Sequence, residues 1–245
     1  MLELSGCIHY FTYMRWLAIV VVLLGAGAWW GYQRLPDRWN PWAPLGFDDP
    51  YNILTAHKLR RLRADPTQCR ALLAQSPLKY VEVPDRDLGK GCAFRDAVQV
   101  SASALAYSSR FTATCPIAAS LALFEHHVLQ PAAFSIFAQP VVRIEHLGSY
   151  ACRNINNRTA GRLSEHATAN AIDLSAFVLK DGTRIAVRAD WPRPVSEAEM
   201  TPKGRFLRAI HKGACRYFKS VLGPDYNSAH HDHFHADMGR YSICR

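Results

Sequence analysis

Hydrophobic and polar positions follow two periods in the last three quarters of the chain. Apolar residues spaced three and four apart predict helices at 66–75, 116–130 and 196–221. Short apolar or alternating runs predict strands at 97–102, 140–145, 171–179, 184–188 and 233–237. These elements predict an α+β fold, in which helices pack on one side of a small, mostly antiparallel sheet.

The N-terminal region carries a different pattern, a continuous apolar segment without charge from Trp16 to Tyr32. Its length is at the short end for a membrane span, and we expect a transmembrane signal anchor at 15–33 after a short tail at 1–14. Ala26-Gly27-Ala28 offers the alternative of a cleaved signal peptide. The aromatic residues that follow, at 29, 30 and 32, favour the anchor because they suit a membrane interface. Met14 is an alternative start, which would make the tail an artefact.

The remainder of the chain contains no internal repeat. Residues 34–58 are rich in Pro and Trp and predict an extended linker. Residues 59–245 are enough for one domain of ordinary size.

Seven cysteines suggest the compartment of this domain. Cys7 precedes the apolar segment and six follow it, none of them in a C-x-x-C pair. An even set of this kind favours an oxidising compartment and up to three disulfides, with fifteen possible connectivities. The local sequence favours Cys69 with Cys92 and leaves the others open. The six candidates are Cys69, Cys92, Cys115, Cys152, Cys215 and Cys244. We therefore expect a single-pass protein of the inner (cytoplasmic) membrane with its domain in the periplasm.

Charge indicates the kind of partner. The chain has 29 Lys and Arg residues against 20 Asp and Glu, a net charge of +9. Such a domain would be attracted to peptidoglycan or another anionic envelope polymer. The expected compartment and the lack of a Lys/Arg run argue against nucleic acid, and no Gly-rich phosphate loop or G-x-S-x-G sequence is present.

Candidate chemistry gathers near the C-terminus, where four histidines and Asp232 fall within residues 230–235. In a strand, His233 and His235 would share one face. Asp173 stands at the start of the strand predicted at 171–179, and His166 on the loop before it. Imidazole and carboxylate are the ligands that a catalytic zinc favours, typically three from the protein with a fourth position left to water.

The order of these residues resembles a known zinc signature. Ser164-x-His166, Ala171-x-Asp173 and the late His233-x-His235 are similar to the superfamily of D-Ala-D-Ala peptidases, murein endopeptidases and lysostaphin-type enzymes. The resemblance implies that His166, Asp173 and His235 bind Zn²⁺. One departure is Ala169, which stands where the dipeptidases usually have Gly.

A longer resemblance covers most of the predicted domain. It is to the bacterial extensin-like C-terminal domain family, and by itself it implies no activity. The residues that carry it are Ser149-Tyr150-Ala151-Cys152-Arg153, Ser164-Glu165-His166-Ala167, Ala171-Ile172-Asp173 and Leu222-Gly223-Pro224-Asp225.

The peptidase resemblance also implies roles around the metal. His233 matches the base of the lysostaphin-type enzymes, and Asp232 lies where the dipeptidases place a glutamate. We favour His233 because imidazole titrates near neutral pH. His230 would assist the oxyanion, and Arg153 would bind and polarise substrate. Ser164 and Tyr150 complete the expected substrate-binding set, with Ser164 either orienting His166 or touching the peptide.

The sequence thus predicts a zinc-dependent peptidase that acts on peptidoglycan stem peptides or cross-links. The alternative is a non-catalytic wall-binding or envelope scaffold module that retains the fold, which Ala169 favours. A third hypothesis is a periplasmic metal-buffering protein without a polymer contact.

Overall fold

The computed structural model describes residues 4–192, 196 and 199–245, so the first three residues of the predicted tail and residues 197–198 of the predicted third helix lie outside it. The chain divides into two compact units, Met1–Ala43 and Pro44–Arg245. The first contains α1 (Leu4–Gln33) and the short η1 (Asp37–Trp39). Within α1, Tyr13–Gln33 is long and apolar enough to cross a membrane, as a single-pass anchor or a signal sequence would be.

The second unit begins earlier than the predicted domain boundary at residue 59. Leu45 and Phe47 are buried in its hydrophobic core. The backbone N–H of Phe47 donates to the side chain of Gln75, and the Phe47 carbonyl lies 2.8 Å from Nε2 of His127. Residues 44–58, which the sequence placed in the linker, are thus part of the compact unit.

One mixed sheet organises the second unit. Its strand order is β1-β4-β5-β6-β7-β10-β9-β11, with β8 paired to β7, and β2 and β3 form a separate hairpin. The strands are β1 (Lys79–Val83), β2 (Arg86–Gly89), β3 (Cys92–Phe94), β4 (Ala97–Ala102), β5 (Ala106–Thr114), β6 (Val141–Gly148), β7 (Ala171–Leu179), β8 (Arg184–Ala186), β9 (Ser220–Leu222), β10 (Phe234–Asp237) and β11 (Ile243–Cys244).

The sheet is mixed, which corrects the prediction of a mostly antiparallel sheet: β5 pairs with β6 and β9 with β11 in parallel, and the other strand pairs are antiparallel. The helical segment 115–137 separates β5 from β6 and carries the chain back to the end of the sheet where β5 begins, so both strands run in one direction. This crossover is a long-range feature that the local apolar pattern does not record.

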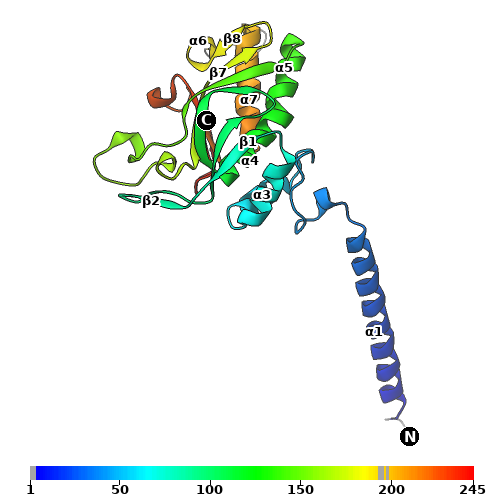
Figure 1. Ribbon diagram of the computed structural model, residues 1–245. Coiled ribbons are helices and arrows are strands. Elements are labelled where there is room, and N and C mark those ends of the chain that lie inside the picture. Colours follow the sequence, from blue (N-terminus) through cyan, green and yellow to red (C-terminus); the bar gives the residue numbers. More distant parts are fainter. Residues whose placement is uncertain (1–3, 193–195, 197–198) are drawn as a thin grey trace. The chain divides into compact units, whose positions relative to one another are not determined.

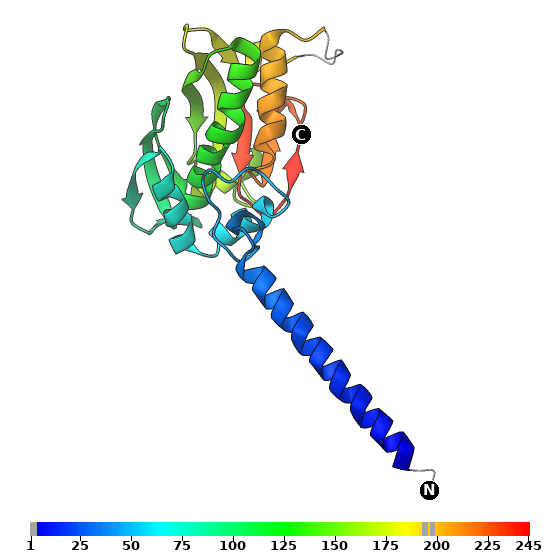
Figure 2. The same cartoon turned by 90° about the vertical axis from the view of Figure 1, so that its right-hand side faces the viewer.

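Helices cover one face of this sheet, as Figures 1 and 2 show. The helix α4 (Cys115–Phe124) continues through a π-helical turn, Glu125–Leu129, into α5 (Gln130–Phe137), which packs against α7 (Pro202–Ala214). The other helices are α2 (Thr55–Leu62), α3 (Pro66–Gln75), α6 (Val187–Asp190), η3 (Ile155–Asn157), η4 (Glu165–Thr168) and η6 (Ser228–His230). The predicted helix at 66–75 is confirmed, and the predicted helix at 196–221 ends at Ala214 because the chain then turns into β9.

Three disulfides lie in the second unit, and they correct the predicted pairing of Cys69 with Cys92. The bonds are Cys69–Cys115, Cys92–Cys152 and Cys215–Cys244. The first joins α3 to α4, and the second joins β3 to the loop after β6. Separation in sequence is a poor guide here, because the β2–β3 hairpin carries Cys92 away from α3.

Candidate metal centre

The candidate site is built on the sheet face opposite the helices. Strands β7 and β10 are antiparallel neighbours, and His235 pairs directly with Asp173. Side chains alternate along a strand, so Phe234 and Ala236 join the core while His235 and Asp237 point to the other face. Ile172 and Leu174 flank Asp173 in the same way, which leaves its carboxylate beside the imidazole of His235.

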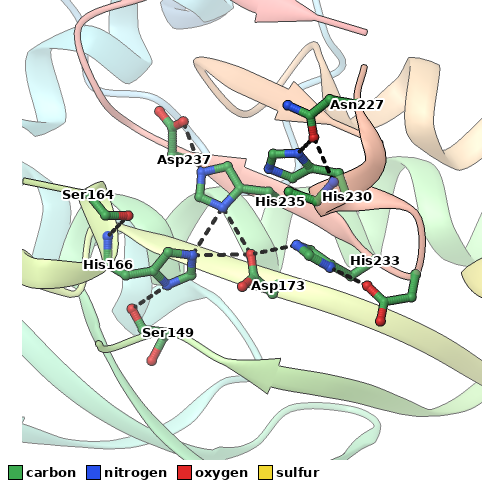
Figure 3. Close-up of polar contacts among 11 residues, drawn as sticks. Ser149, Ser164, His166, Asp173, Asn227, His230, His233, His235 and Asp237 are labelled. Atoms are coloured by element: carbon green, nitrogen blue, oxygen red, sulfur yellow. Dashed lines mark hydrogen bonds and ion pairs between the residues drawn. The ribbon is translucent and has the colours of Figure 1, made fainter. Parts of the chain in front are cut away.

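Three ligand-type atoms converge at this point (Figure 3). The Nε2 atom of His166, on η4, lies 3.0 Å from Nδ1 of His235 and 3.2 Å from Oδ1 of Asp173. The third distance, from Nδ1 of His235 to Oδ1 of Asp173, is 2.9 Å. Sequence analysis named these three residues as a set, and the fold brings them together from positions up to 69 residues apart.

The outer nitrogen of each imidazole has an acceptor that fixes its tautomer. Nδ1 of His166 lies 3.1 Å from the carbonyl oxygen of Ser149, and Nε2 of His235 lies 3.3 Å from Oδ2 of Asp237. A carbonyl and a carboxylate can only accept, so both outer nitrogens carry hydrogen. In the neutral state, Nε2 of His166 and Nδ1 of His235 therefore present bare lone pairs to each other and to Asp173.

Three acceptors that face one another require a cation between them. Without a metal that cation is a proton, and the pKa values reflect this. Burial opposes a charge on His235, but Asp173 and Asp237 outweigh it and raise the pKa of His235 to about 9. Burial likewise disfavours the Asp173 carboxylate, yet its hydrogen bonds to His166 and His235 hold the pKa of Asp173 far below the usual range. The electrostatic environment of the cluster thus favours a positive charge between the three side chains.

His233 and Asp232 form a pair beside this cluster. Nδ1 of His233 lies 2.8 Å from Oδ1 of Asp232, and its Nε2 lies 3.6 Å from Oδ1 of Asp173. The hydrogen bond from His233 lowers the pKa of Asp232 and keeps this carboxylate ionised. Nε2 of His233 lines the same cavity as the three ligand-type residues, whereas Asp232 lines a neighbouring groove.

His230 lies against the other two imidazoles of the C-terminal cluster. Its ring centroid is 5.3 Å from that of His233 and 5.7 Å from that of His235, and Nδ1 is 2.7 Å from Oδ1 of Asn227. Burial and the neighbouring histidines lower the pKa of His230 to about 4, so this ring is neutral at pH 7. His231 is exposed and turns to the carbonyl of Ser228.

The remaining predicted residues are divided between two places. Arg153 and Ser164 line the cavity, and Ser164 caps η4, where its hydroxyl accepts from the backbone N–H of His166. Tyr150 packs against Phe94 with 4.8 Å between centroids and lines a different pocket. Ser164 thus orients His166 through its backbone, and Tyr150 is not brought to the cavity.

Ala169 ends η4 in the left-handed conformation, with φ 54° and ψ 27°. That region favours glycine. The residue is fully buried, and its N–H still donates to the carbonyl of His166. Alanine therefore accepts the backbone conformation that the turn between His166 and Asp173 requires.

The cavity above the cluster has a volume of about 410 Å³. Three arginines, Arg153, Arg162 and Arg240, stand in its wall together with Tyr226 and Tyr241. Two other clusters of metal-ligating residue types each contain a disulfide, so their cysteines offer no thiolate. Among the residues that the structure describes, the arrangement that could hold a divalent ion beside an open cavity is the one formed by His166, Asp173 and His235.

Sequence reasoning missed two groups that support this cluster. Asp237 follows His235 by two residues, so strand periodicity alone puts both on one face, and that signal was present in the sequence. The carbonyl of Ser149 left no such signal, because any residue could supply it.

Comparison with known proteins concerns most of the second unit, from residue 67 onward. A model of the extensin-like protein C-terminus matches residues 67–245, and a comparison with curated proteins gave no match. The matched range includes the three disulfides, the sheet from β1 to β11 and every residue of the candidate centre. The chain therefore belongs to the extensin-like C-terminal family.

Proposed function

We propose that this protein is a zinc-dependent peptidase that acts on peptidoglycan stem peptides or cross-links. One observation carries the proposal. Two imidazole nitrogens that carry no hydrogen when the rings are neutral, and one carboxylate oxygen, lie within 3.2 Å of one another beside an open cavity. Their outer partners fix both tautomers, as is usual for histidine ligands of metals.

His166, Asp173 and His235 would hold the ion. Nitrogen and oxygen donors suit zinc, and catalytic sites have three protein ligands where closed structural sites have four. The bound ion would lower the pKa of a water to about 7 and polarise the scissile carbonyl.

His233 is the general base in this proposal. Asp232 holds the proton of Nδ1, so Nε2 is free to take a proton and points into the cavity toward Asp173. The same pairing favours His233 over Asp232 as the base, because it engages Asp232, which lines a neighbouring groove. Asp232 is then a positioning residue that keeps His233 in the correct tautomer.

His230 and Arg153 would act on the substrate. Nδ1 of His230 is engaged by Asn227, so its Nε2 is available to hydrogen-bond a carbonyl oxygen or an amide. Arg153 contributes positive charge to the same wall, where it would stabilise a developing oxyanion. Together with Arg162 and Arg240, it favours a substrate that carries carboxylates, as peptidoglycan stem peptides do.

We place the domain on the periplasmic side of the inner membrane, held there by α1 as an anchor. Three disulfides support an oxidising compartment, and the positive net charge favours contact with an anionic envelope polymer. The second candidate, a wall-binding module without turnover, is favoured by the same arginine-rich wall. It predicts binding without cleavage.

The test uses the full chain purified in detergent. Bound metal is measured by elemental analysis, and fragments released from purified sacculi are identified by mass spectrometry. About one zinc per chain with new fragments supports the peptidase. Zinc and saturable binding without fragments support the binding module, and absence of zinc contradicts the metal centre.

Three variants sharpen this test. His235→Ala should lose zinc and activity together, whereas His233→Ala should keep zinc and lose rate. His231→Ala is the matched control, because it lies in the same cluster but faces solvent. Unchanged activity in either of the first two variants would refute the assignment.

A further inference from the structure

A second cavity lies in the same unit, away from the candidate metal centre. Its volume is about 180 Å³, and its walls come mainly from residues within 51–60 and from the segment 215–219 that links α7 to β9, with Met238 and Ser242 completing the lining. A water molecule takes up about 30 Å³ of liquid, so the cavity can admit a group several times larger.

Two residues that line this cavity each have a polar side-chain atom without a hydrogen-bond partner among the residues that the structure describes. The two atoms are the hydroxyl of Tyr217 and Nε2 of His57, and both are shielded from solvent. The whole Tyr217 side chain is buried, with 2% of its surface exposed. Because buried polar groups are nearly always hydrogen-bonded, this pair suggests that an external group satisfies them.

The charge around the cavity indicates the chemistry of that group. Arg60, Arg216 and Lys219 stand in the wall, and the described residues that line the cavity include no Asp or Glu. A hydroxyl donor surrounded by three cations suits an anion rich in acceptor oxygens, and phosphate is such an anion.

Apolar side chains at the mouth point to a lipid source for the phosphate. Ile53 is 86% exposed and Tyr51 is 41% exposed, and both line the cavity. Exposed aliphatic and aromatic residues beside cations are typical of surfaces that enter the headgroup region of a bilayer. Tyr51 also follows the end of α1 by 18 residues, which span at most roughly 60 Å when extended. A bilayer crossed by α1 is thus within reach of this surface.

We infer that this cavity binds the phosphate of an anionic phospholipid and docks the domain on the membrane surface. A small shift of the Tyr217 and His57 side chains would expose the hydroxyl and Nε2 to the phosphate oxygens, with which they would form hydrogen bonds. Arg60, Arg216 and Lys219 would neutralise its charge, and Ile53 would enter the interface. The inference does not depend on zinc or on peptidase activity.

Hydrogen–deuterium exchange of the full chain in nanodiscs tests this inference. Discs of phosphatidylcholine alone are compared with discs that also contain phosphatidylglycerol. We expect deuterium uptake of the segments 51–60 and 215–219 to fall at least about twofold in the anionic discs, because bound surfaces open less often. Equal uptake in the two kinds of disc would overturn the inference.

Variants and a free-phosphate arm identify the contacts. Tyr217→Phe removes only an unpartnered hydroxyl, so it should fold normally and lose the protection, as should Arg216→Gln combined with Lys219→Gln. Lys212→Gln is the control, because this exposed lysine on α7 is not in the cavity wall. Full protection in Tyr217→Phe would overturn the inference. So would protection by inorganic phosphate in neutral discs, which would indicate a soluble ligand.

Discussion

Asp237→Asn tests whether the outer partner of His235 fixes the tautomer of this histidine at the candidate metal centre. Oδ1 of Asp237 accepts from the backbone N–H of Gly239 at 2.7 Å, and Oδ2 accepts from Nε2 of His235 at 3.3 Å. Both partners are donors, and an asparagine has only one oxygen to offer them. The backbone N–H of Gly239 cannot become an acceptor, so the asparagine oxygen would stay with it and the amide NH₂ would face His235.

His235 would then have to change tautomer. Its Nε2 would accept from Asn, and the hydrogen would move to Nδ1, the atom that faces Asp173 and His166. A protonated nitrogen cannot bind a metal, so the change of tautomer would remove Nδ1 of His235 as a metal ligand. Loss of such an outer partner typically lowers metal affinity 10- to 100-fold, which corresponds to about 1.4–2.7 kcal/mol.

Competition with a chromophoric zinc chelator measures this change in the dissociation constant. The matched control is Asp232→Asn, which has the same chemistry but alters the partner of His233, a residue outside the proposed ligand set. This control should keep its zinc affinity within about threefold and lose turnover. An Asp237→Asn protein that binds zinc as tightly as the unmodified protein would refute the reasoning about His235.

Three further predictions concern stability. Zinc at 100 times its dissociation constant should raise the free energy of unfolding by about 2.7 kcal/mol over the metal-free protein in a chelator-controlled thermal melt, and the increase should vanish in His235→Ala. Burial outweighs the hydrogen bonds from Ser103 and Tyr107 and raises the pKa of Glu125 to about 7, against 4.5 ordinarily. Protonation of Glu125 therefore contributes to the stability of the folded protein below about pH 4.5, and this contribution is lost as pH rises through 7. Denaturant unfolding should show up to about 3 kcal/mol of this loss relative to Glu125→Gln, and identical pH profiles would contradict it. Replacing the Cys215–Cys244 bond by two serines should lower stability by about 3–4 kcal/mol, because it closes a loop of 29 residues, and unchanged urea unfolding would argue otherwise.

The proposed ligand set was predictable because its signal is local. Strand periodicity put His235 on one face of 233–237, and the hairpin pattern put Asp173 at the start of 171–179, which the fold reproduces as β10 and β7. The resemblance to zinc peptidases then added His166 to the predicted ligand set. The hydrogen bond between His233 and Asp232 was not predictable, because it depends on which way the loop before β10 turns the Asp232 side chain.

Features set by long-range packing could not be predicted from the sequence. Leu45 and Phe47 stand among prolines and tryptophans, a composition typical of linkers, and only contact with the folded core buries them. The helical run at 116–130 was predicted, but its π-helical turn at Glu125–Leu129 was not, because nothing in helical periodicity distinguishes it. The parallel pairs and the disulfides depend on the same tertiary contacts.

Rigidity at the candidate centre depends on this long-range part of the fold. Strand β10 supplies both His235 and Asp237, and it is held between β7 and β9. Strand β9 is supported in turn by β11, which ends at Cys244 and is bonded through it to Cys215 at the end of α7. A metal site needs its ligands held to within about half an ångström, so the order of β10 should depend on this outer support. Opening the Cys215–Cys244 bond should therefore weaken zinc binding as well as stability, although neither cysteine touches the ligands.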